Sequence, residues 1–206
     1  MRNITVLFEK SGYKNLVYKT TEENQTINIV YSLKYFESII IEETGEDLIT
    51  KNTDRYTFHN IGNHIVKVKF KIGIKYLYDA FMECKQLIEI PENLFYDNPE
   101  IIEFGYCYIS ASYDTFLGCF MGCTGLTSIP KGLFNNNKAA SDFYFCFALC
   151  PNLTGETPSD ENGIKLWERT SENGYIDEIT GTACFTNCLN LTDYSEIPDN
   201  WKTENP

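Results

Sequence analysis

The chain has 206 residues and a formal net charge of −12 at pH 7, and the negative charge is concentrated in its second part. Residues 1–78 hold 11 Lys and Arg against 9 Asp and Glu, whereas residues 79–206 hold 6 against 20. This acidity excludes binding along a nucleic-acid backbone, which needs clustered cations, and no apolar run approaches the roughly 20 residues of a membrane-spanning helix, so no membrane insertion is expected.

The first 71 residues have the pattern of a small β protein. They contain neither Cys nor Pro, and apolar and polar residues alternate at 4–8, 26–31, 38–42, 55–58 and 64–70. This spacing predicts a small antiparallel β-sandwich of immunoglobulin-like type over residues 1–71. Residues 56–68 have the pattern of its final hairpin, in which Gly62 and Asn63 supply the positive φ of a tight turn. Because about 70 residues are few for a sandwich, we expect this module to share its core with the rest of the chain.

Four copies of one phrase, Phe-x-x-Cys-x-x-Leu, follow at residues 81–87, 120–126, 147–153 and 185–191. A repeated unit buries its apolar face only against its neighbours, so residues 72–206 are predicted to form a solenoid. The Phe-x-x-Cys spacing fits one helical turn with both side chains on one face. The Leu-x-x-Ile spacing predicts a short strand that ends at the next proline, as at Pro91 and Pro130. The fold is therefore expected to be mixed but mainly β.

The end units of a solenoid need to be covered, because their outer faces have no neighbour. We expect the β module to cover the first unit. Residues 197–202, which include Trp201, are expected to cover the last one.

The units differ in length, and the excess lies in two insertions. Successive phrases begin 39, 27 and 38 residues apart, which places the extra residues near 105–117 and within 158–182. Insertions in a solenoid often form its binding face. Tyr106, Tyr108 and Tyr113 in the first insertion and Trp167 in the second are therefore the candidate binding residues, with rings for stacking. Packing of the same rings between units is the alternative.

Seven of the eight cysteines follow the repeat, and we expect them to form a buried ladder of free thiols. They are Cys84, Cys119, Cys123, Cys146, Cys150, Cys184 and Cys188. The Cys-x-x-Cys knuckle typical of zinc sites is absent, so no metal is expected. Disulfides stay open as an alternative, although a thiol ladder suits a reducing compartment and two cysteines four residues apart on a helix are poorly placed for a bridge.

The sequence contains no catalytic motif. His59 and His64 flank the last predicted turn without a nucleophile nearby, and there is no Gly-rich phosphate loop, Gly-x-Ser-x-Gly or His-Glu-x-x-His. Residues 160–163, Asp-Glu-Asn-Gly, resemble a calcium loop in composition only, because the alternating ligand spacing of an EF-hand is missing. We therefore expect a protein that is not an enzyme and carries no cofactor.

The repeat resembles a known class. Leu-Thr-Ser-Ile-Pro-Lys-Gly-Leu-Phe at 126–134, preceded by Cys-Phe-Met-Gly-Cys-Thr-Gly at 119–125, is similar to the BspA-like leucine-rich repeats of gut Bacteroidetes and their phages. The placement of a short β module before the repeats is also similar to the layout of that class. The resemblance implies an adhesion or interaction protein, with protein partners or a glycan.

Two functions are left open by these observations. The segment at 1–10 has too short an apolar run for a secretion signal, so we expect synthesis in the cytoplasm without export. This favours a phage virion component of the tail, baseplate or capsid exterior, in which the β module docks and the acidic repeats contact protein neighbours or copies of themselves. The alternative is a bacterial cell-surface adhesin that binds a glycan or a host protein.

Overall fold

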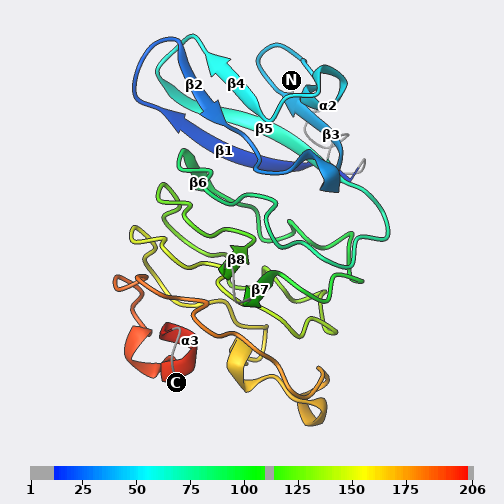
Figure 1. The fold of residues 1–206 in the computed structure, drawn as a ribbon, viewed down its shortest axis with the longest axis vertical. Helices are drawn as coiled ribbons and strands as arrows, with labels where there is room; N and C mark the ends of the chain where they lie inside the picture. Colours follow the sequence, from blue (N-terminus) through cyan, green and yellow to red (C-terminus); the bar gives the residue numbers. More distant parts are fainter. Residues whose placement is uncertain (1–11, 110–113, 204–206) are drawn as a thin grey trace.

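The computed structural model describes residues 12–109 and 114–203, except for the side chains of 107–116. The strand expected at 4–8 lies outside these residues. Over the described residues the fold is mainly β, with few and short helices (Figure 1). The strands are β1 (Lys14–Thr20), β2 (Gln25–Asn28), β3 (Phe36–Ile41), β4 (Arg55–Phe58), β5 (Gly62–Phe70), β6 (Leu87–Glu89), β7 (Gly105–Ile109) and β8 (Asp114–Gly118). The helical turns are η1 (Leu33–Tyr35), α2 (Leu48–Lys51), η2 (Leu166–Glu168), η3 (Ser171–Asn173), η4 (Tyr194–Glu196) and α3 (Asp199–Lys202).

The first part of the chain forms two antiparallel sheets. One has the strand order β3-β5-β1-β6, and the other consists of β2 and β4. β1 was not among the alternating runs named from the sequence, although its burial alternates, with Leu16 and Tyr18 buried and Val17 between them half-buried. Ile27 of β2 and Phe58 of β4 are buried in the same core.

The hairpin predicted at residues 56–68 is wrong. β4 pairs with β2, and β5 pairs with β1 and β3, so the connection between β4 and β5 joins two sheets. Gly62 has the positive φ expected of it, at 140°, whereas Asn63 continues β5 opposite Lys19. His64 stacks on Phe58 with ring centroids 3.9 Å apart. The two strands therefore contact each other through side chains and not through backbone hydrogen bonds. A turn signal in the sequence does not distinguish these two arrangements.

The sheet and the core of the β module continue into the repeats. β6, which comes from the first repeat unit, pairs with the edge of β1, and Lys19 N donates to Gln86 O at 2.9 Å. Phe81 of the first phrase lies 5.7 Å from Phe36 and 6.3 Å from Phe70, measured between ring centroids. One cluster of buried apolar residues extends from Leu16 to Trp201. The expected sharing of the core is therefore confirmed.

The Phe-x-x-Cys stretch forms a tight turn, and the helical turn predicted for it is wrong. In three of the copies the Cys N–H donates to the Phe carbonyl at 3.1 Å, namely at Cys84, Cys123 and Cys188. The third residue of each copy has a positive φ; these residues are Glu83 (58°), Gly122 (73°), Leu149 (60°) and Asn187 (62°). A positive φ at the third position is the mark of a type II turn, which shares its four-residue length with a single helical turn.

The strand expected before each Ile-Pro is found only in the first unit, as β6. In the next units this stretch is extended and linked by single backbone bonds, such as Thr127 N to Ile88 O at 3.4 Å and Thr154 N to Thr127 O at 2.9 Å. Isolated parallel bridges also connect the units, in the order Tyr76, Glu103, Asp142 and Thr180. Successive units therefore lie parallel and in register, with too few paired residues to form strands.

Side chains of the four phrases stack from unit to unit. The rings of Phe81 and Phe120 are 5.4 Å apart and tilted by 8°, those of Phe120 and Phe147 are 5.2 Å apart at 5°, and those of Phe147 and Phe185 are 5.9 Å apart at 5°. From the second copy on, the thiol of the phrase donates to the Phe carbonyl one unit back, as in Cys123 to Phe81 at 2.9 Å. The same contact is made by Cys150 to Phe120 and by Cys188 to Phe147, both at 3.1 Å.

The far end of the stack is covered as predicted. Trp201 of α3 stacks on Phe185 at 6.3 Å, and its ring lies over Gly181, where an added Cβ would be 2.2 Å from it. Trp201 is only 3% exposed. Figure 1 shows the sheet of β1, β3 and β5 at one end of the molecule and α3 at the other.

Candidate binding surfaces

The first insertion is the hairpin of β7 and β8, and its base is pressed against the next unit. Gly105 pairs with Gly118 at this base. A Cβ at Gly105 would lie 1.8 Å from the Tyr144 carbonyl oxygen, and one at Gly118 would lie 2.1 Å from the Phe145 carbonyl oxygen. Neither contact leaves room for a side chain, so the two glycines let the hairpin sit directly on the backbone of the following unit.

Tyr106 belongs to a row of three tyrosines, which we call the tyrosine row. Its ring lies 5.1 Å from that of Tyr78, which lies 5.6 Å from that of Tyr76. Tyr76 is 45% exposed, and the other two are half-buried. Tyr76 and Tyr78 were not among the predicted binding residues, although their i, i+2 spacing in an extended segment places them on one side of the chain. Tyr108 lies in β7, but its side chain and Tyr113 fall outside the described structure.

Two carboxylates accompany the tyrosine row. Glu103 bridges Tyr76 on one side and Asp142 on the other, through parallel backbone pairs. Burial and then a hydrogen bond with Glu103 raise the pKa of the Tyr78 hydroxyl. Burial also raises the pKa of Asp142 to about 6, with the neighbouring charge of Glu103 acting in the same direction and the Tyr144 N–H opposing it. The row therefore combines exposed aromatic faces with negative charge.

Trp167 lies elsewhere, at the covered end of the stack. Its ring is 5.9 Å from that of Trp201 and 6.4 Å from that of Phe185, both at steep angles. It is half-buried against the core cluster. Trp167 thus packs with the C-terminal cap while Tyr106 packs with Tyr78, so the structure does not bring the two candidates together.

The seven repeat cysteines are buried and free, as the ladder interpretation requires. Burial raises the pKa of the Cys84, Cys123 and Cys150 thiols well above the usual value, and it raises that of Cys188 to about 12. Because the thiolate is the reactive form, these groups are chemically inert in the folded chain. Within the described residues, no group of three or more His, Cys, Asp and Glu is arranged to hold a metal ion.

The two histidines are engaged in structural contacts. His64 is 3% exposed and contacts Glu43 through Nδ1 and Thr20 Oγ1 through Nε2, the latter at 2.8 Å. His59 Nδ1 lies 2.7 Å from Asn24 Oδ1. Both sets of contacts tie the ends of β4 and β5 to neighbouring turns.

A second surface, which sequence reasoning missed, is a polar groove that crosses three consecutive units. It consists of three adjoining hollows of about 430, 220 and 150 Å³ that all contain Asn135. Its walls come from the loops that follow Pro91, Pro130 and Pro158. The polar groove is lined by Glu92, Asn93, Tyr96, Lys131, Gly132, Asn135, Lys138, Ser159, Asp160, Glu161, Asn162, Asn173 and Tyr175.

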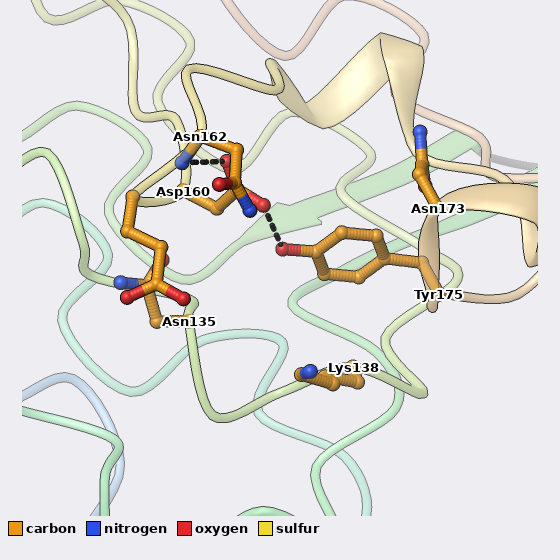
Figure 2. Close-up of a pocket in the computed structure, with 7 residues that line it drawn as sticks. Asn135, Lys138, Asp160, Asn162, Asn173 and Tyr175 are labelled. Atoms are coloured by element: carbon orange, nitrogen blue, oxygen red, sulfur yellow. Dashed lines mark hydrogen bonds between the residues drawn. The ribbon is translucent and has the colours of Figure 1, made fainter.

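One end of the polar groove is held in shape by Asp160. Its carboxylate accepts hydrogen bonds from Asn162 N at 2.8 Å, Ile164 N at 2.9 Å and the Tyr175 hydroxyl at 2.8 Å. Although burial opposes it, these hydrogen bonds hold the pKa of Asp160 below its usual value, so this side chain is charged at neutral pH. Figure 2 shows the Tyr175 ring pointing towards Asp160, with Asn135 and Lys138 beside them.

Arg169 packs against the ring face of Tyr175. The guanidinium carbon lies 4.3 Å from the Tyr175 ring centroid, and Nη2 donates to the Phe134 carbonyl at 3.2 Å. A cation over an aromatic face is attracted by the ring quadrupole. The second insertion, which supplies Arg169 and Tyr175, is in this way anchored on the second repeat unit and forms one wall of the groove.

Across the described ranges 12–109 and 114–203, the helices are all too short or too polar to cross a membrane. Comparison of the chain with protein-family models, with curated proteins and with solved structures gives no match.

Proposed function

We propose that this chain is a non-catalytic interaction protein, built as a leucine-rich-repeat solenoid of the BspA-like class with an immunoglobulin-like module at its N-terminal end. The stacked phenylalanines, the thiol-to-carbonyl bonds and the covering of the last unit by Trp201 support this architecture. They make the side chains of the stack a rigid scaffold. Its function then depends on the surfaces that it presents.

The tyrosine row carries the proposal. Tyrosine is enriched in protein–protein interfaces because it offers a large rigid apolar face at low entropic cost, together with a hydroxyl. Tyr76 and Tyr106 stand at the two ends of the row and are held by Tyr78, whose hydroxyl is fixed by Glu103. Glu103 and Asp142 add negative charge, so the surface suits a protein partner with a basic patch.

The setting that we propose is a phage particle, in which the chain is a structural component of the tail, baseplate or capsid exterior. The difference in charge between the two parts of the chain supports two separate contacts, one for the β module and one for the acidic repeats. The second candidate is a bacterial surface adhesin, which is favoured by the polar groove.

Co-sedimentation tests the proposal. Full-length protein and the double variant Tyr76→Ala/Tyr106→Ala would be added to the source culture and followed into virus-sized particles and cell envelope by mass spectrometry. Tyr96→Ala, which removes an exposed tyrosine of the polar groove and leaves the tyrosine row intact, is the matched control for particle association. We expect the wild type and Tyr96→Ala in the particle fraction, with at least about tenfold less of the double variant, since hot-spot truncations typically have effects of this size.

Equal recovery of the double variant in particles would contradict the role of the tyrosine row. Recovery of the wild type in the cell envelope alone would contradict the proposed role as a virion component and support the role as an adhesin.

A further inference from the structure

We propose that the polar groove binds a neutral oligosaccharide chain laid across three repeat units. The site is separate from the tyrosine row and does not depend on the function proposed above.

Gly132 lets two side chains of the groove pack directly over its backbone. A Cβ at this position would lie 2.3 Å from Glu92 Oε1 and 2.8 Å from Asn135 Nδ2, both of them side-chain atoms of groove residues. Among the described residues, the positive-φ glycines do not include Gly132, so its backbone does not require glycine. The missing side chain instead leaves space for the ends of Glu92 and Asn135, and Gly132 and Asn135 line two of the adjoining hollows.

The polar groups of the groove are available to a ligand. In the part of the chain that the structure describes, Glu92, Glu161, Lys131 and Lys138 form no ion pair within 4.0 Å. Asn135 is half-buried and lines all three hollows. Its Oδ1 has no hydrogen-bond partner among the described residues but is shielded from solvent, so its amide nitrogen is the group that it offers to a ligand. Carboxylate oxygens accept hydrogen bonds, and ammonium and amide nitrogens donate them. The groove therefore offers hydrogen-bond donors and acceptors side by side. This suits a ligand with hydroxyl groups, because each hydroxyl is both a donor and an acceptor.

An exposed ring lies at the wide end. Tyr96 is 63% exposed and lines the hollow of about 430 Å³. The face of an aromatic ring is partly negative, so it attracts the C–H groups on the flat side of a sugar ring. Tyr96 thus supplies an apolar contact, and Asn135 and Glu161 supply polar ones. Ligand sites combine both kinds, because a few polar groups fix the orientation of the ligand.

Other polymers fit less well. An anionic chain would meet the charged Asp160, Glu92 and Glu161 against only two lysines. An extended peptide is held by a free strand edge or by apolar pockets. The groove wall is instead made of closed turns, such as Leu133 N to Pro130 O at 3.2 Å and Asn135 N to Gly132 O at 2.9 Å. A neutral chain of hydroxyl-rich rings remains as the class that matches the surface.

The test is calorimetric titration of the full-length protein with a panel of neutral oligosaccharides of three to six hexose, deoxyhexose or N-acetylhexosamine units. Matched uronic-acid and sulfated oligosaccharides and a basic peptide serve as competitors of other chemistry. Gly132→Ala, Tyr96→Ala and Glu161→Gln are the groove variants. Glu23→Gln, on an exposed turn of the β module, and Tyr76→Ala, in the tyrosine row, are the controls.

We expect at least one neutral oligosaccharide to bind, each groove variant to weaken its affinity by about tenfold or more, and both controls to leave it unchanged. The urea midpoint of each variant, measured in parallel, shows that the fold is intact. Absence of binding by every neutral member, binding of acidic members or of the peptide only, or equal affinity in the groove variants would overturn the inference. Loss of particle association in Tyr76→Ala/Tyr106→Ala with unchanged sugar binding would show that the groove and the tyrosine row are independent binding sites.

Discussion

At the scale of single residues, the phenylalanines of the repeat phrase are the main stabilising elements of the stack. Phe120 is fully buried, and its ring is sandwiched between Phe81 at 5.4 Å and Phe147 at 5.2 Å. Its carbonyl also accepts the Cys150 thiol. Removal of this ring leaves a cavity that the neighbouring units cannot close without losing register.

We predict that Phe120→Ala lowers the free energy of unfolding by about 3–5 kcal/mol, the range for a large aromatic residue in a close-packed core. Urea unfolding followed by fluorescence measures the change. Tyr96→Ala, at a 63% exposed site, should change it by less than about 0.5 kcal/mol. Similar effects of the two substitutions would show that Phe120 is not enclosed between its neighbours.

Asp142 gives a pH prediction. Its pKa is raised to about 6 in the folded chain, above the ordinary value of 3.8, so the folded state holds this proton more tightly than the unfolded state. The stability contributed by this group is therefore present below about pH 4, falls as the pH rises to about 6 and is constant above that. Between pH 4 and 6, the wild type should lose stability relative to Asp142→Asn, which keeps the oxygen that accepts the Tyr144 N–H. Parallel pH curves of the two proteins would show that the pKa of Asp142 is not raised.

At the scale of elements, β6 links the β module to the repeats. It covers one edge of β1, and Phe36 and Phe70 of the module lie against Phe81 and Phe95 of the first unit. A fragment that ends at residue 71 loses the edge strand and these ring contacts together. The module is then left with a partial core.

We predict that the fragment 1–71 does not unfold cooperatively by itself, and that the longer fragment 1–104 recovers part of the native circular dichroism. The reason is that residues 72–104 restore β6, Phe81 and Phe95. Thermal melts and amide dispersion in proton–nitrogen NMR spectra would show the difference. A sharp melt and a well-dispersed spectrum of the shorter fragment would mean that the module needs no repeat.

Much of the arrangement of these elements could be predicted from sequence, because it depends on spacing. The four phrases mark residues that do stack, the first insertion coincides with the hairpin of β7 and β8, and Trp201 covers the last unit. The backbone conformation of the Phe-x-x-Cys stretch could not be predicted in the same way, because a spacing of three residues fits both a helical turn and a type II turn. Gly122 and Asn187 at the third position were the signal for the turn, since both residues favour a positive φ.

The binding surfaces could be predicted only in part, for a spatial reason. Tyr106 was found because it lies in an insertion, but its neighbours Tyr76 and Tyr78 come from the segment before the first phrase. The polar groove combines loops of three units with the second insertion, so its residues are up to 83 positions apart, from Glu92 to Tyr175. Only the stacking order of the units brings these loops together.

At the scale of the whole molecule, one continuous core connects the two ends. Both tryptophans, Trp167 and Trp201, lie at the C-terminal end, whereas the larger sheet lies at the other. Tryptophan fluorescence therefore reports on one end, and far-ultraviolet circular dichroism is weighted towards the strands of the other. We predict that urea transitions followed by the two probes coincide, as in two-state unfolding. Transitions at clearly different urea concentrations would show that the β module and the repeats unfold independently.

The proposed function is tested most directly by a chemical footprint of the tyrosines in the native assembly. The free protein and the protein in isolated source particles would be nitrated under identical conditions, and modification at each tyrosine would be measured by mass spectrometry. We predict that Tyr76, which is 45% exposed in the free chain, is protected in the particles, while Tyr96, which is 63% exposed on another surface, reacts equally in both. Unchanged reactivity of Tyr76 would contradict the central claim that the protein acts by burying its tyrosine row against a partner.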